Sequence, residues 1–301
     1  TSAVMRAILA AALAGTASAS GGAAVPVQEA KLVASDAAQG DFCGWAVAVS
    51  GDTAVVGSPR DDDAGSASGS AYVFVRSGTA WAQEAKLTAA DAAAGDEFGV
   101  SVAVAGDRVV VGAHRRAGPG ADAGAAYVFA RSGTTWSQQA ALTPADGAAG
   151  DRFGASVGLH GLTAVVGAPQ DDDLGAEAGA AYVFTSDGTS WFEFSKLQRL
   201  DGGAGDLFGT SVSAGAGVVL AGAPGHDHGS GAAGAAYVFR RSGGNWFQEG
   251  ELRPSDRVPA DPFGVALERS LASAVVALPL HDGAAIDAGA AYVYAISGTA
   301  W

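Results

Sequence analysis

Acidic and imidazole side chains gather at one recurring position of this chain, directly after short valine-rich segments. Counting the second copy, where an arginine takes the place of the acid, successive groups are 55 residues apart. Carboxylate oxygens suit calcium and imidazole nitrogens suit zinc, so these groups are candidates for metal or ligand binding. The candidates are Asp61, Asp62, Asp63, Arg116, Asp171, Asp172, Asp173, His226, Asp227, His228, His281 and Asp282.

Two interpretations of these groups stay open. In one, the oxygens of neighbouring loops hold a divalent cation, with Asp62, Asp172 and Asp227 as the weak metal candidates and calcium as the weakly bound ion. In the other, which we favour, the loops are simply solvated, because nothing in the pattern closes a coordination shell. Zinc bound by His226, His228 and His281 is a further alternative. We expect no required cofactor.

A second set of aspartates recurs with the same period, in the segments that begin near Asp36. A single ligand site seldom needs five copies, so we assign these residues a structural role. Their carboxylates are expected to accept hydrogen bonds from the loop backbone in Asx turns. The residues are Asp41, Asp96, Asp151, Asp206 and Asp261.

The elements that must position these side chains repeat without insertion or deletion. Tyrosine stands at 72, 127, 182, 237 and 292, and tryptophan at 81, 136, 191, 246 and 301. A fixed period of this size indicates a solenoid, a propeller or an array. Within a repeat we expect four strands, at about Trp45–Val49, Thr53–Gly57, Ser70–Val75 and Trp81–Leu87.

The apolar pattern selects the propeller among these architectures. The first three strands are apolar runs typical of buried strands, whereas the fourth alternates like an outer strand with one solvated face. Four-stranded units of this kind are propeller blades, which bury their faces against one another. We therefore predict an all-β propeller of five 55-residue repeats. Recurring phenylalanines should be buried between its blades, namely Phe98, Phe153, Phe208 and Phe263.

The two ends of the sequence suggest how such a ring closes. Residues 27–32 match residues 82–87, a fourth strand, and the chain stops at Trp301 just before one. We expect residues 27–32 to pair with the strand around Ala291–Ala295, which would leave no open edge. The alternative is a fragment of a longer array.

Length, charge and cysteine usage narrow the class of protein. A net charge of −14 without a basic stripe argues against nucleic acid as a partner. Residues 1–19 carry the pattern of a signal peptide, with an alanine-rich leader as the alternative; residues 20–26 are a linker, and 27–301 the propeller. We expect no transmembrane segment. The single cysteine, Cys43, is expected to fill the pocket that Phe98 fills one repeat later.

The motifs Phe153-Gly154 with Gly167-Ala168-Pro169, and Phe208-Gly209 with Gly222-Ala223-Pro224, resemble FG-GAP repeats. These are the blades of the propeller in integrin α-subunits, and the resemblance covers about residues 27–301. It implies an extracellular propeller for ligand binding and adhesion. Integrin propellers have seven blades and calcium loops between strands one and two. Here that connection is as short as Gly51-Asp52, too short for calcium.

These observations lead to three hypotheses on function. We favour a secreted or cell-surface, non-enzymatic and monomeric propeller that binds an extracellular protein or glycan through its Asp-rich loops. The first alternative is a glycoside hydrolase with a carboxylate pair near the central channel. The second is a purely structural repeat of the cell envelope. The chain carries no G-x-S-x-G, H-E-x-x-H or P-loop pattern.

Overall fold

The structure of this chain is a computed structural model that describes residues 28–227, 231, 233–256, 261–270, 273–281 and 287–295. Within these ranges the chain forms nineteen β-strands and no α-helix. A helix long and apolar enough to cross a membrane is therefore not found among the described residues.

The strands follow one another in five antiparallel sheets. The first and second sheets consist of β1 (Ala46–Ser50), β2 (Thr53–Ser58), β3 (Ser70–Ser77), β4 (Ala80–Leu87), β5 (Ser101–Ala105), β6 (Arg108–Ala113), β7 (Ala125–Ser132) and β8 (Thr135–Leu142). The third and fourth consist of β9 (Ser156–His160), β10 (Thr163–Ala168), β11 (Ala180–Ser186), β12 (Trp191–Leu197), β13 (Ser211–Gly215), β14 (Val218–Ala223), β15 (Ala235–Ser242) and β16 (Asn245–Leu252). The fifth has three described strands, β17 (Leu267–Arg269), β18 (Ser273–Leu278) and β19 (Ala290–Ala295).

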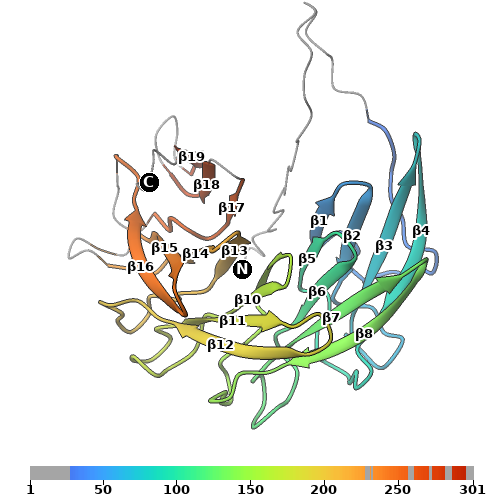
Figure 1. Cartoon of the computed structure of the whole chain (residues 1–301), viewed down its shortest axis with the longest axis horizontal. Coiled ribbons are helices and arrows are strands. Elements are labelled where there is room, and N and C mark those ends of the chain that lie inside the picture. The colour runs from blue at the N-terminus through green and yellow to red at the C-terminus, as the bar shows by residue number, and fades with distance from the viewer. Residues whose placement is uncertain are drawn as a thin grey trace, which may run out of the picture.

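The sheets are the five blades of a β-propeller, as the sequence predicts. The first strand of each sheet lies innermost and contacts the first strand of the next, from β1 through β5, β9 and β13 to β17. Figure 1 shows the sheets arranged in this order around a common axis. Each of the four strands predicted within the repeat is present in the first four sheets, with bounds in the first sheet that differ by one or two residues from the predicted ones.

The blades pack through their valine-rich middle strands. Val109, Val110 and Val111 of β6 are all buried, because a strand between two neighbouring blades has no solvated face. Phe98 packs against Tyr127 and lies in one core cluster with residues of the first and second sheets. Its three equivalents Phe153, Phe208 and Phe263 are buried to the same degree. The core of the molecule is thus a series of interfaces between blades.

A contact between two glycines fixes the distance between neighbouring blades. A Cβ atom on Gly57 would lie 2.0 Å from the carbonyl oxygen of Gly99 in the next repeat. The same 2.0 Å holds between Gly112 and Gly154, between Gly167 and Gly209, and between Gly222 and Gly264. Glycine is required there because two backbones touch. The fifth sheet carries Ala277 at this position.

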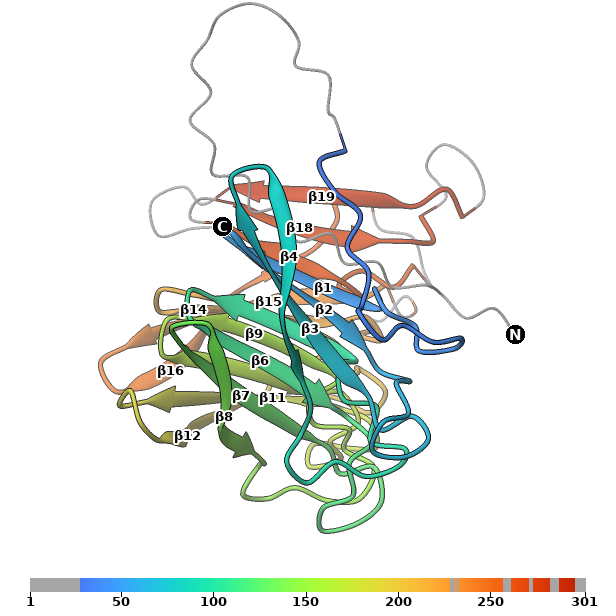
Figure 2. The same ribbon diagram turned by 90° about the vertical axis from the view of Figure 1, so that its right-hand side faces the viewer.

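The segment before β1 lies along the first sheet (Figure 1, Figure 2). Leu32 and Ala34 pack against Val56, Tyr72 and Phe74, as Leu87 and Ala89 pack one repeat later. Residues 28–32, however, form no strand, and within the described residues β19 pairs with β18 alone. Closure of the ring through residues 27–32 therefore stays a prediction.

The expected burial of Cys43 is wrong. Cys43 is exposed, and its neighbour Phe42 is 49% exposed. Phe42 stacks on Trp45, with 6.0 Å between the ring centroids. Phe98 is buried because it lies between two sheets, whereas no described sheet precedes the one that follows Cys43.

Candidate functional site on the loop face

The Asp-rich loops lie on one face of the propeller, which we call the loop face. It carries the loops that join the second strand of each sheet to the third, and those that join one sheet to the next. The two kinds of loop are hydrogen-bonded to each other: Gly95, Glu97 and Phe98 donate backbone N–H groups to the carbonyls of residues 66–68. The face is therefore a continuous surface held by backbone hydrogen bonds rather than a set of independent loops.

The centre of the first acidic group is occupied by a lysine. The Nζ atom of Lys86, on β4, lies 2.7 Å from Asp36, 2.9 Å from Asp61 and 2.5 Å from Asp63. The Tyr72 hydroxyl donates to Asp36 and Asp61, at 2.8 Å each. These three carboxylates lie close enough together for a metal ion. The ammonium group of Lys86 neutralises part of their charge at that point.

The third sheet repeats this arrangement almost atom for atom. Lys196 Nζ lies 2.9 Å from Asp146, 2.8 Å from Asp171 and 2.6 Å from Asp173. The Tyr182 hydroxyl donates to Asp146 and Asp171. Burial would raise the pKa of Asp146, but hydrogen bonds from Lys196 and Tyr182 outweigh it and hold the pKa below its usual value. Both groups are thus lysine-centred ion clusters.

The other three sheets place a different side chain beside the aspartates of the same loops. In the second sheet Arg116 Nη2 lies 2.6 Å from Asp91. In the fourth, buried Arg199 lies 2.7 Å from Asp206 and contacts His226 Nδ1 at 2.6 Å. In the fifth, His281 contacts two aspartates, described below. Four blades therefore hold a lysine or an arginine at their loop carboxylates, and the fifth holds His281, which is a cation when protonated.

The middle aspartates, proposed as weak metal ligands, accept hydrogen bonds from their own loops. Asp62 Oδ1 accepts the N–H of Ala67 and Asp172 Oδ1 that of Glu177, both at 2.7 Å. Asp227 Oδ1 accepts the N–H of residue 231 at 2.9 Å. Each contact closes its loop between the aspartate and a backbone N–H four or five residues later. The candidates His228 and Asp282 lie outside the described residues.

The second set of aspartates is buried beneath the loop face. Asp41, Asp96, Asp151 and Asp206 each accept a backbone N–H from the residue three positions earlier, at 2.6–2.9 Å. Burial raises the pKa of Asp96 and Asp151. Asp261 differs, because its Oδ2 atom contacts the Nδ1 atom of His281 at 3.0 Å. These side chains point into the loops that they support.

Calcium ligands at the family's usual position do not fit this chain. β1 and β2 are joined by Gly51 and Asp52 alone, and Asp52 already pairs with Arg76 at 2.7 Å. Calcium takes about six to eight oxygen ligands, which a two-residue hairpin does not supply.

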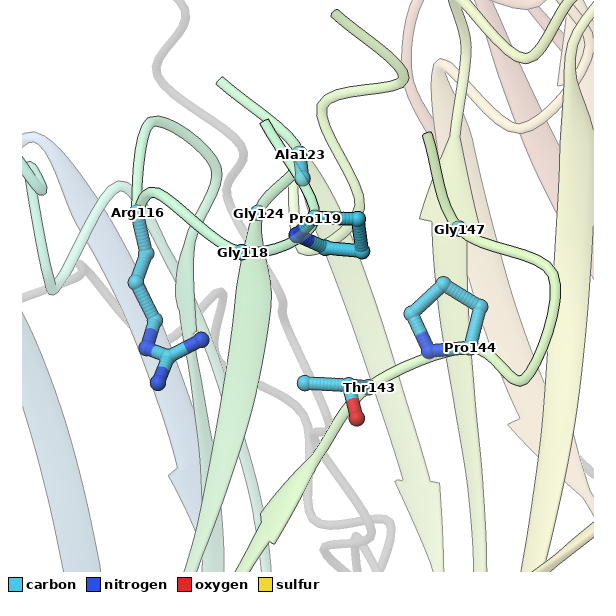
Figure 3. A pocket seen from close by; sticks show the side chains of 8 residues that line it. All are labelled: Arg116, Gly118, Pro119, Ala123, Gly124, Thr143, Pro144 and Gly147. Atoms are coloured by element: carbon cyan, nitrogen blue, oxygen red, sulfur yellow. The ribbon is translucent and has the colours of Figure 1, made fainter. Parts of the chain in front are cut away.

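A cavity opens on the loop face where the second repeat departs from the others. It has a volume of about 280 Å³ and is lined by Arg116, Gly118, Pro119, Ala123, Gly124, Thr143, Pro144 and Gly147. Figure 3 shows the loop of Gly118 and Pro119 facing Thr143 and Pro144 across it. Glycine stands here where the first and third repeats have Asp63 and Asp173, and Ala141 stands where they have lysine. The smaller side chains leave room that the lysine-centred clusters fill.

His281 gives the loop face a pH-dependent contact. The hydrogen bond with Asp261 raises the pKa of His281, burial opposes this, and Asp256 adds to the rise. A raised folded-state pKa stabilises the fold below the unfolded value of about 6.5, and this contribution is lost as the pH rises through the folded-state pKa.

Because His281 loses its charge in this range, we expect the melting temperature to fall from about pH 6.5 upward. The slope should shrink in His281→Gln but not in His160→Asn, an exposed histidine; equal slopes in native protein and His281→Gln would contradict this.

Comparison with known protein families matches four stretches of the chain to the FG-GAP repeat, residues 26–74, 81–129, 136–184 and 191–239. Together they span more than half of the chain. Each of the last three stretches begins in the fourth strand of one sheet and ends in the third strand of the next, so it contains one interface between blades. A search of curated proteins finds no matching relative.

Proposed function

Because this chain belongs to the FG-GAP repeat family, we propose that it is a secreted or cell-surface binding module, without catalytic activity, that engages a protein or glycan through its loop face. The family's propellers present such loops as a recognition surface. The observation that carries the proposal is the cavity lined by Arg116, Thr143 and Pro144. It interrupts an otherwise periodic face, and a specific partner needs a feature that is not repeated five times.

The charges of the loop face support recognition that does not depend on a metal ion. In the first and third sheets, an ammonium group already contacts the three carboxylates that a bridging cation would need. The cavity also has a cation in its wall, Arg116, whose Nε and Nη2 atoms contact Asp91. A ligand bound there meets small apolar side chains beside a guanidinium, which suits an uncharged or weakly acidic group.

The distribution of carboxylates gives less support to a glycoside hydrolase. Such an enzyme pairs a protonated acid with a second carboxyl group about 5–9 Å away. Within the described spans of the five innermost strands, Glu268 is the only carboxylate. Burial raises its pKa, and the hydroxyl of Ser213 donates to it at 3.0 Å. Hydrogen bonds from Lys86 and Lys196 help to hold the pKa of Asp36, Asp61 and Asp146 below the usual value, which does not suit an acid catalyst.

Filling the cavity tests the proposal. We expect the native protein to bind at least one member of a panel of immobilised collagen, fibronectin, and neutral and acidic polysaccharides. Thr143→Trp should weaken that binding about tenfold or more, because the indole occupies the space of the ligand. Surface plasmon resonance measures both.

The matched control is Thr88→Trp, the equivalent exposed position one repeat earlier. It should leave binding unchanged. Equal binding by native protein and both variants would place recognition elsewhere. A folded protein that binds nothing in the panel would favour the purely structural role.

A further inference from the structure

The outer rim of the propeller carries hydrogen bonds that link successive blades. Between the first and second sheets, Glu84 of β4 accepts the Trp136 indole N–H at 2.8 Å and pairs with Arg131 at 3.4 Å. Between the second and third, Gln139 of β8 accepts the Trp191 indole N–H at 3.0 Å. A polar acceptor on a fourth strand thus holds the tryptophan of the next blade.

This link is missing between the third and fourth sheets. Phe194 of β12 stands where Glu84 and Gln139 stand in earlier repeats. The indole Nε1 of Trp246 is consequently buried with no hydrogen-bond partner among the described residues. A buried N–H without an acceptor costs about 1–3 kcal/mol, so its persistence calls for a physical reason.

The arginine at the same interface, Arg241, also has no carboxylates at the positions where its equivalent in the second sheet has two. Arg131 pairs with Asp107 at 2.6 Å and with Glu84, and its equivalent in the fourth sheet is Arg241. Gly217 replaces the aspartate and Phe194 replaces the glutamate. Arg241 forms no salt bridge with the described residues, and its guanidinium lies 4.6 Å from the centre of the Phe194 ring.

An exposed aromatic ring completes the group. Trp191 and Glu193 of β12 bond to the second sheet and to the loop that follows it. Phe192 lies between them in an alternating strand, so it points the other way, toward the fourth sheet. Its side chain is 55% exposed, and the equivalent residues in the first two repeats are Ala82 and Ser137.

We propose that Phe192, Phe194, Arg241 and Trp246, the rim patch, bind a carboxylate-bearing sugar of an acidic glycan. The sugar ring stacks on the exposed phenyl face of Phe192, and its carboxylate pairs with Arg241, whose guanidinium lies over Phe194 at the interface where the Trp246 N–H is buried. The unpaired guanidinium favours an anion on a molecule whose net charge is −14.

The size of the patch favours a sugar over a protein partner. A stable protein interface needs about 800 Å² on each side, with some 20 residues. The rim patch has only four side chains, of which Phe192 is 55% exposed. One guanidinium beside one exposed aromatic face matches the footprint of a single acidic sugar. This site is separate from the loop face and does not depend on the function proposed there.

The test compares three probes of equal length: the hexasaccharide of galacturonic acid, the hexasaccharide of galactose and a hexaglutamate peptide. The Trp246 indole N–H signal, assigned by its loss in Trp246→Phe, reports binding by nuclear magnetic resonance. We expect the galacturonate hexamer alone to shift this signal, and salt to weaken its binding. Equal or stronger binding of the peptide, equal binding of the galactose hexamer, or no shift with any probe would each overturn the proposal.

Two variants install the residues of an earlier repeat. Phe192→Ser and Phe194→Gln copy Ser137 and Gln139 of the second sheet. Each should weaken galacturonate binding about tenfold or more. Phe194→Gln should also raise the melting temperature, because it supplies the missing acceptor. The control Phe247→Ala removes an equally exposed ring outside the patch and should bind normally; loss of binding in this control, or normal binding in both patch variants, would contradict the assignment.

Discussion

Replacement of Phe153 by alanine is expected to lower the free energy of unfolding by about 3–5 kcal/mol. The ring has no exposed surface and lies between the second and third sheets. It makes edge contacts with Tyr182 and Phe184, with centroid distances of 5.5 and 5.9 Å. Removing it leaves a cavity that rigid blades cannot close, and such a cavity adds to the lost burial. Urea denaturation followed by tryptophan fluorescence measures the change.

Phe247→Ala is the matched control, because its ring is 55% exposed on an outer strand. It should change the unfolding free energy by less than about 0.5 kcal/mol. Similar losses in the two variants would mean that burial between blades is not what makes Phe153 important.

The second large effect is expected from Lys196→Met. The variant keeps the aliphatic volume but removes the ammonium from Asp146, Asp171 and Asp173. Asp171 is only 3% exposed, so it is left as a buried charge beside two others. Breaking a buried pair in this way costs about 3–5 kcal/mol, and we expect a loss of about 3 because Lys196 is partly solvated. Chemical denaturation at pH 7 measures it.

The pH dependence gives a separate check on the same cluster. The lowered pKa of Asp146 stabilises the native fold above the unfolded value of about 3.9, and this contribution is lost as the pH falls through the folded-state pKa. In Lys196→Met, the three aspartates repel one another without the ammonium group, and protonation at low pH relieves this repulsion. The two proteins should therefore approach equal stability below about pH 4. Restoring neutrality with Asp171→Asn and Asp173→Asn should recover most of the loss; no recovery would contradict the electrostatic explanation.

The architecture could be predicted from the sequence because the repeat has a fixed length. Tyr127 and Trp136 recur at constant spacing, and the valine runs and hairpin turns between them assign strand order without ambiguity. The burial of the phenylalanines follows from the same pattern. The position of Cys43 could not be predicted, since burial there depends on a neighbouring sheet and not on the residue itself.

Only the acidic residues of the charged clusters could be identified from the sequence. The aspartates stand out as triplets, whereas Lys86 and Lys196 lie in the alternating fourth strands and look like solvated residues. The sequence nevertheless contains a signal. Where the loop begins with aspartate, at Asp61 and Asp171, the fourth strand of the same repeat carries lysine. Where the loop has arginine or histidine instead, the fourth strand carries Ala141 or Glu251. Comparing repeats with one another at paired positions reveals this exchange of charge. Arg199 carries no such signal, because its counterparts in other repeats are alanine or proline.

The contact between paired glycines bears on how such a chain lengthens by duplication. Gly167 of one unit touches Gly209 of the next, so each unit is matched to its successor and not only to itself. Copying an internal unit preserves every such match and adds one more interface of the same kind. Copying the fifth unit into the interior would set the methyl group of Ala277 against a backbone carbonyl. Duplication of an internal repeat therefore preserves the interface between neighbouring blades, so internal repeats are the ones from which new blades can be added.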